Sequence, residues 1–223
     1  LLIDLPYGPA VAARPGGGTL GRDIRACLPG GYLHGLRRGE VDVSIRRGHK
    51  TGAQLAKLGE YYAECIHDNN IPVETLFGPA YKGIPLAVSA VVALSNKFGI
   101  DVSYCFDRKE VKDHGEGGMF VGKNLSDGEK VLIIDDVMTS GKALRETLPK
   151  LKAAADVDVS GMVITVDRME KGTGELSAVQ EAKRDFGITV YSIVNIEDII
   201  EAIRNDIVPG KEYLDKMLEY RST

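Results

Sequence analysis

Residues 131–143, called the acid motif below, read Val-Leu-Ile-Ile-Asp-Asp-Val-Met-Thr-Ser-Gly-Lys-Ala. An uninterrupted apolar run is typical of a strand in a parallel sheet that is buried on both faces. Open α/β sheets place their ligands at the carboxyl ends of such strands. The turn and the helix-forming residues that follow would present backbone N–H groups at a helix N-terminus, which attracts anions. The acid motif therefore predicts an α/β fold with an anion site beside two carboxylates.

The two acids of this motif, Asp135 and Asp136, indicate what the anion is attached to. Carboxylates beside a phosphate loop can accept hydrogen bonds from hydroxyl groups that a phosphate alone does not satisfy. A phosphorylated ribose carries a diol and a phosphate on one small frame. The alternative is the metal-binding strand of a P-loop ATPase, which would need a Gly-x-x-x-x-Gly-Lys-Ser/Thr loop. The chain has no such loop.

The remainder of the chain from residue 51 alternates between helical and strand periodicity, which predicts a mostly parallel sheet flanked by helices. Strands are expected at 73–77, 101–107, 131–135, 159–166 and 189–194, and helices at 53–67, 84–97, 142–154, 177–186, 196–204 and 211–220.

A second segment with chemical potential, the lysine loop, spans residues 78–87 and reads Gly-Pro-Ala-Tyr-Lys-Gly-Ile-Pro-Leu-Ala. It follows an expected strand and opens an expected helix. Its glycines let the backbone approach a ligand closely, and Lys82 adds a cation that suits a diphosphate. An ordinary turn with a solvated lysine is the alternative, and the presence of the acid motif favours the diphosphate interpretation.

The third segment, residues 108–118, reads Arg-Lys-Glu-Val-Lys-Asp-His-Gly-Glu-Gly-Gly and is called the charged segment. No apolar periodicity ties it to a core, so it is expected to move and to close over a ligand. Departure of a diphosphate generates negative charge, which the cations would stabilise while the segment excludes water. These cations are Arg108, Lys109, Lys112 and His114. A solvated charged loop is the alternative.

The composition of the chain argues against several classes of protein. The 223 residues carry a formal net charge of −4, which argues against a general nucleic-acid binder. No apolar run approaches the ~18 residues that a membrane span needs, so no membrane association is expected. The three cysteines, Cys27, Cys65 and Cys105, show no zinc or redox spacing. Free buried thiols match a reducing cytoplasmic location.

The acid motif closely resembles the 5-phosphoribosyl 1-diphosphate (PRPP) signature of the type I phosphoribosyltransferases. The resemblance implies that family's fold, with a small N-terminal hood. It also implies that Mg²⁺ is a cofactor that arrives bound to PRPP, and it assigns no protein side chain as a metal ligand. It implies catalytic roles for Lys112, His114, Asp135 and Asp136. The residues implied to bind PRPP and its diphosphate are Tyr81, Lys82, Arg108, Lys109, Lys112, His114, Asp135, Asp136, Val137, Met138, Thr139, Ser140, Gly141, Lys142 and Ala143.

The charged segment and the lysine loop look like those of the orotate phosphoribosyltransferases, in particular the fungal and enterobacterial form. The match runs from about Thr51 to the C-terminus. It implies a transferase that makes orotidine 5′-monophosphate from orotate and PRPP in pyrimidine biosynthesis, with orotate bound near Thr139 and Arg168. It also implies a homodimer in which the charged segment reaches the neighbouring site, and a cis peptide bond at Ala80-Tyr81. A purine-type phosphoribosyltransferase and a PRPP-binding regulator of the same fold remain as alternatives.

Residues 1–50 do not share the resemblance. They hold ten of the 26 glycines and seven arginines against one lysine, without helical or strand periodicity. The family's Lys-Ser-Gly-Arg and Ser-Pro-Tyr-Phe-Phe-Asn segments, which contribute to the orotate pocket, are absent from them. We therefore divide the chain into an anomalous segment, 1–50, at the hood position and a phosphoribosyltransferase core, 51–223. Our hypothesis is that residues 1–50 come from a wrong reading frame, and that a genuine segment would leave the orotate pocket incomplete.

Overall fold

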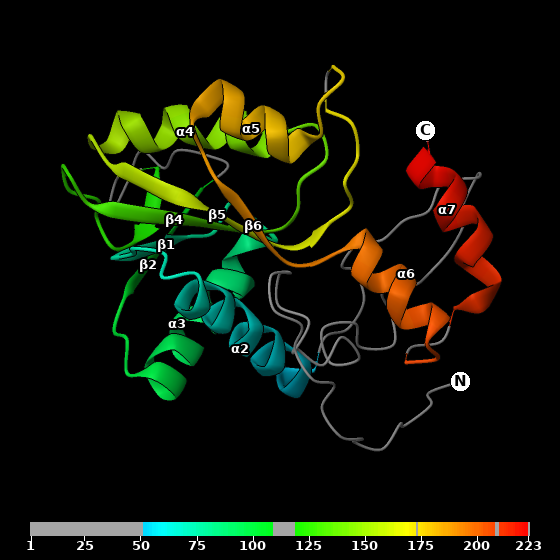
Figure 1. Ribbon diagram of the computed structural model, residues 1–223. Coiled ribbons are helices and arrows are strands. Elements are labelled where there is room, and N and C mark those ends of the chain that lie inside the picture. The colour runs from blue at the N-terminus through cyan, green and yellow to red at the C-terminus, as the bar shows by residue number, and fades with distance from the viewer. Residues whose placement is uncertain (1–50, 109–118, 173, 208–209, 223) are drawn as a thin grey trace.

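The computed structural model describes residues 51–108, 119–172, 174–207 and 210–222 (Figure 1). The expectations for residues 1–50, including the hood and the wrong-frame hypothesis, fall outside this part of the chain. None of the helices in the described residues is both long and apolar enough to cross a membrane.

A six-stranded sheet in the order β3-β2-β1-β4-β5-β6 forms the centre of the molecule. Five strands are parallel, as predicted, and β3 alone pairs antiparallel, with β2. The strands are β1 (Thr75–Phe77), β2 (Ser103–Asp107), β3 (Phe120–Gly122), β4 (Lys130–Val137), β5 (Asp158–Asp167) and β6 (Val190–Asn195).

Helices cover both faces of the sheet (Figure 1). On one face lie α2 (Gly52–Asp68) and α3 (Gly83–Phe98), and on the other α4 (Lys142–Ala154) and α5 (Ala178–Phe186). The α6 helix (Ile196–Arg204), a 3₁₀ turn η1 (Lys211–Tyr213) and α7 (Leu214–Ser222) close the chain and join the core on the α2 side.

The central strand β4 is buried on both faces because its side chains alternate between two cores. Leu132 and Ile134 pack with the α2 and α3 side, whereas Val131 and Ile133 pack with the α4 and α5 side. All four are completely buried. This arrangement explains why the sequence of β4 is continuously apolar rather than alternating.

Local signals set the helix ends. The side chains of Thr51 and Gln54 form a capping box at the start of α2, and Ser177 with Gln180 repeats it at α5. Gly99 ends α3 with a φ of 66°, a left-handed conformation that costs glycine little. These short-range features explain why the expected helix positions agree with the structure to within a few residues.

Two expectations about secondary structure were wrong. The short strand β3 lies where no strand was expected, because three residues beside a Gly-rich segment show too little alternation to be recognised. The helix expected at 211–220 is divided into η1 and α7.

Candidate active site

The carboxyl ends of β1, β4 and β5 meet at one edge of the sheet, because these strands are parallel. The lysine loop follows β1, the second half of the acid motif follows β4, and Arg168 follows β5. The predicted ligand-binding segments, separated by tens of residues in sequence, therefore share one edge. This is the edge at which parallel α/β sheets bind ligands.

Asp135 and Asp136 end the buried part of β4 and are themselves buried. The Asp136 N–H donates to Asp135 Oδ1 at 2.8 Å, and the Val137 N–H donates to Asp136 Oδ1 at 2.9 Å. Each carboxylate therefore keeps a second oxygen for other partners, since a carboxylate has two oxygens with about four lone-pair sites.

Tyr62 holds the main chain at this point. Its hydroxyl donates to the carbonyl oxygen of Asp135 at 2.7 Å and lies 2.6 Å from Thr165 Oγ1 on β5. With the Tyr62 proton directed to Asp135, the Thr165 hydroxyl is the donor of the second bond. In the sequence, Tyr62 lies within the helix expected at 53–67 and belongs to none of the three predicted binding segments. The available signal was that a buried tyrosine hydroxyl needs a partner.

The lysine loop reaches the acid motif directly. Lys82 Nζ lies 2.7 Å from Asp136 Oδ2, across 54 residues of sequence. The lysine side chain is 57% exposed and the aspartate side chain 5%, so the ion pair joins a buried carboxylate to a cation at the surface. The neighbouring Ala80-Tyr81 peptide bond is cis, as the resemblance implied, and Tyr81 is exposed.

Two glycines allow the lysine loop to fold back on itself. A Cβ atom at Gly78 would lie 2.4 Å from the carbonyl oxygen of Gly83. A Cβ at Gly83 would lie 2.6 Å from Pro79 Cδ and 2.7 Å from the carbonyl oxygen of Ile134. These distances leave no space for a side chain, so the glycines are required by close backbone approach.

The turn between β4 and α4 has the form expected of an anion loop. Gly141 adopts a φ of 66° and immediately precedes the first residue of α4. Thr139 and Ser140 are exposed, whereas Met138 is buried in the core on the α4 side. Exposed Lys142 lies 3.7 Å from Glu146. The N-terminal N–H groups of α4 are therefore available at the same edge as the carboxylates.

Asp135 has an unusually high pKa, and burial of its carboxyl group is the main cause. Removal of the Asp135 carboxyl from water, with the neighbouring charge of Asp136 in second place, raises the pKa of Asp135 to about 7. A carboxyl with a raised pKa is a common feature of functional sites, because a structure built for stability alone avoids burying such a charge.

We expect the Asp135→Asn substitution to stabilise the ligand-free protein at alkaline pH. The pKa of Asp135 is higher in the folded than in the unfolded chain, so the wild type loses stability as pH rises from about 4 to about 7. Asparagine does not ionise and keeps an oxygen for the Asp136 N–H. Urea unfolding should therefore show a gain on the order of a few kcal/mol at pH 8 that vanishes near pH 4. A gain that is equal at both pH values would contradict this explanation.

Arg168 lies just beyond β5 and is mostly buried, with its side chain 12% exposed. Its Nη2 lies 3.1 Å from Glu170 Oε2, which fixes the guanidinium. Burial also raises the pKa of the preceding Asp167, whose Oδ1 accepts the Met169 N–H. Arg168 is thus an ordered cation at the site edge.

Arg108 is half-buried at the end of β2, and its N–H donates to the carbonyl oxygen of Met119 at 2.7 Å. Lys109, Lys112 and His114 lie outside the described residues, so their predicted roles remain predictions.

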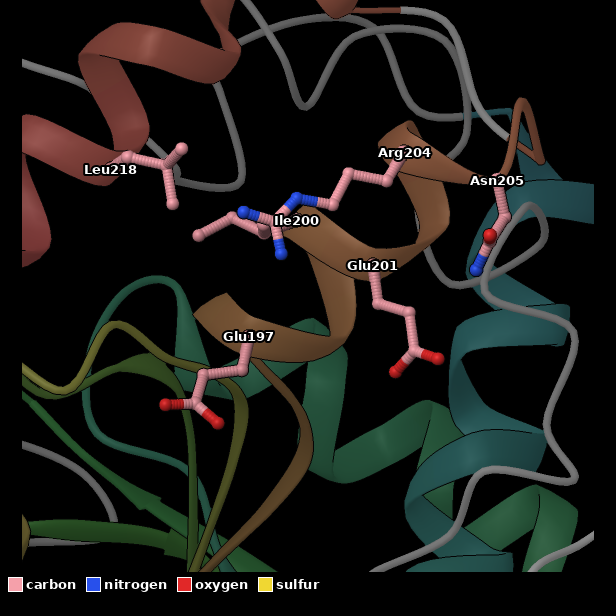
Figure 2. A pocket seen from close by; sticks show the side chains of 6 residues that line it. All are labelled: Glu197, Ile200, Glu201, Arg204, Asn205 and Leu218. Carbon is pink, nitrogen blue, oxygen red and sulfur yellow. The ribbon is translucent and has the colours of Figure 1, made fainter.

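A separate hollow of about 410 Å³ lies between α6 and α7 (Figure 2). No residue that lines it belongs to the three predicted segments. The lining residues are Glu197, Ile200, Glu201, Arg204, Asn205 and Leu218.

Comparison with known proteins agrees with this geometry. A family model described as the phosphoribosyl transferase domain matches residues 49–186. An orotate phosphoribosyltransferase of Clostridium botulinum (strain Alaska E43 / Type E3) is 51% identical over 174 residues, 78% of each chain. One from Haemophilus ducreyi is 48% identical over 172 residues, which cover 77% of this chain and 79% of the relative.

A solved structure supports the same assignment. The crystal structure of the Francisella tularensis orotate phosphoribosyltransferase is 41% identical and superposes with a TM-score of 0.66, covering 78% of this chain and 81% of that one. The chain therefore belongs to the phosphoribosyltransferase family and, within it, to the orotate phosphoribosyltransferases.

Proposed function

We propose that the chain transfers the 5-phosphoribosyl group of PRPP to N1 of orotate, which yields orotidine 5′-monophosphate and diphosphate for pyrimidine biosynthesis. The observation that carries this function is the convergence of Lys82 with Asp136, beside the α4 N-terminus. It combines groups suited to a diphosphate, a diol and a phosphate at one sheet edge. The relatives with the same name support the choice of orotate.

Each part of PRPP has a proposed partner. Asp135 and Asp136 accept hydrogen bonds from the ribose hydroxyls, and the backbone N–H groups of residues 137–143 surround the 5′-phosphate. Lys82 exchanges Asp136 for the departing diphosphate, with Tyr81 beside it. The exposed lysine side chain can turn towards the diphosphate, and the ribose hydroxyls then donate hydrogen bonds to the buried Asp136 carboxylate in its place.

Mg²⁺ is the proposed cofactor. Among the described residues no group of three or more His, Cys, Asp or Glu side chains is placed to hold a metal. Two adjacent carboxylates nevertheless provide hard oxygen donors, which Mg²⁺ prefers when substrate phosphates and water complete its shell. Asp135 and Asp136 would thus hold an ion that arrives with PRPP, and the ion would neutralise charge on the diphosphate.

The proposed reaction needs no protein nucleophile. A bond forms between orotate N1 and the anomeric carbon of the ribose while the bond from that carbon to the diphosphate oxygen breaks, and the N1 proton leaves to the departing diphosphate or to water. Catalysis then rests on positioning and on electrostatic stabilisation of the departing diphosphate. Arg168 binds the carboxylate or carbonyl oxygens of orotate, with Thr139 near the same pocket.

The cations of the charged segment complete the proposal. Arg108, Lys109, Lys112 and His114 would stabilise the diphosphate as it leaves and exclude water from the anomeric carbon. We also propose a homodimer whose subunits exchange this segment, and a cytoplasmic location. The buried free thiols of Cys65 and Cys105 support a reducing compartment.

Release of diphosphate by the purified protein tests the function. We expect PRPP and Mg²⁺ to give diphosphate with orotate, and none above background with adenine, hypoxanthine or uracil. Reactions without PRPP and with excess chelator are the controls. Release that depends on a purine would replace orotate by a purine base as substrate. Binding of PRPP with no turnover of any base, together with a DNA gel shift, would favour a regulator.

A further inference from the structure

A buried carboxylate behind the lysine loop has no role in the reaction described above. Asp107 is the last residue of β2 and only 5% exposed. Its Oδ1 accepts the backbone N–H of Ala80 at 2.8 Å, and its Oδ2 lies 2.5 Å from Nζ of Lys150 on α4. One side chain thus connects β2, the lysine loop and the helix that follows the acid motif.

The Ala80 contact fixes the orientation of one peptide unit. In the peptide between Pro79 and Ala80, the N–H donates to Asp107, and the carbonyl oxygen accepts the Gly83 N–H at 3.0 Å. A planar peptide held at both its N–H and its C=O cannot rotate without losing a hydrogen bond. The next residues along the chain are Tyr81 and Lys82, so this peptide determines where the loop presents its cation.

Lys150 makes the arrangement compatible with an anionic ligand. A buried carboxylate without a counter-charge would repel a diphosphate bound to the same loop, because electrostatic interactions are weakly screened inside a protein. The Lys150 ammonium neutralises Asp107 from the side of α4, and its side chain is 35% exposed. The pair therefore provides an acceptor for the Ala80 N–H without net negative charge.

We propose that Asp107 is a positioning residue for the diphosphate of the substrate and that Lys150 neutralises it. This inference rests on the proposed function for the identity of the ligand. Asp107 contacts neither Asp135, Asp136 nor residues 139–143 through any interaction described above. Its effect should therefore be confined to ligands that carry a diphosphate and should spare those held only by ribose hydroxyls and a 5′-phosphate.

Calorimetry with PRPP, diphosphate and ribose 5-phosphate tests this selectivity. We expect Asp107→Ala to weaken PRPP and diphosphate binding by about tenfold or more, the loss expected for a hydrogen bond to a charged group. Ribose 5-phosphate binding should change by less than about twofold. Equal weakening of all three ligands, or of none, would overturn the proposal. Thermal melting identifies a variant that fails to fold.

A second variant keeps the test decisive if Asp107→Ala unfolds. Asp107→Asn keeps an oxygen for the Ala80 N–H but sets an amide against Lys150, so we expect an intermediate loss. The double variant Asp107→Asn/Lys150→Met removes that conflict and should restore diphosphate affinity to within about threefold of wild type. Lys150→Met alone leaves the Asp107 carboxylate without a counter-charge and should weaken diphosphate binding. Lack of recovery in the double variant would contradict the positioning role.

Glu129 offers a matched control at the opposite edge of the sheet. It is also a buried carboxylate, it accepts the Ser126 N–H at 2.9 Å, and it lies 3.1 Å from Nζ of Lys123. Glu129→Gln should leave diphosphate affinity unchanged, and a loss equal to that of Asp107→Ala would overturn the proposal. Because binding is measured without turnover, failure of orotate-dependent diphosphate release in the wild type would reject the proposed function separately.

Discussion

The double substitution Asp135→Asn/Asp136→Asn is expected to lower kcat/KM for PRPP by about a thousandfold or more. Each proposed carboxylate–hydroxyl hydrogen bond is charge-assisted and contributes on the order of 1.5–3 kcal/mol, or about 10- to 100-fold in affinity. The substitution also removes the oxygen charge available to Mg²⁺. Initial rates of diphosphate release over a range of PRPP concentrations measure the effect.

The control for this prediction removes the same charge from the other end of the sheet. Asp127 and Asp158 lie at the amino-terminal edge, where Asp127 Oδ1 accepts the Asp156 N–H and Asp158 begins β5. Replacing both by asparagine should leave kcat/KM within about twofold, since a distant surface charge changes little. An active Asp135→Asn/Asp136→Asn variant would show that the carboxylates do not hold the ribose.

Substitution of Arg168 by alanine should strongly reduce the use of orotate while PRPP binding remains. An arginine that pairs with a carboxylate in a partly buried site forms strong, directional hydrogen bonds. Their loss is expected to lower kcat/KM for orotate by about 100-fold or more. Arg168→Lys should recover only part of this activity, because an ammonium does not reproduce the planar fork of the guanidinium.

Steady-state kinetics with orotate, combined with calorimetry of PRPP, separates this effect from misfolding. Arg184 is a suitable control, because it lies on α5 and forms an ion pair with exposed Asp185 at 2.5 Å. Arg184→Ala should leave both measurements unchanged. If Arg168→Ala weakened PRPP and orotate equally, Arg168 would be stabilising the edge of the sheet rather than selecting the base.

Much of the fold was predictable because its signals are local. The apolar run of β4, the capping residues of α2 and α5, and Gly99 at the end of α3 each act within a few residues. The same holds for the acid motif, whose carboxylates and helix N-terminus are neighbours in the chain. By contrast, β3 depends on pairing with β2 and is too short for its own sequence to indicate a strand.

The residues that hold the site in place were not predictable in the same way. Tyr62 has the spacing of an ordinary core residue, and its hydrogen bond spans 73 residues. Asp107 was included in an expected strand without a role, although a buried acid at the carboxyl end of a strand was a usable signal. Its two partners lie 27 and 43 residues away, so no local pattern connects them.

By itself, the amino-acid sequence determined the type of fold, the family, and the chemical groups offered to a ribose phosphate, because each depends on neighbouring residues. Only the tertiary structure decided that Lys82 contacts Asp136, that Asp107 holds the lysine loop, and that burial raises the pKa of Asp135. Contacts and burial of this kind follow from the order of strands in the sheet. That order is set by packing across the whole molecule, because the central strands must bury both of their faces.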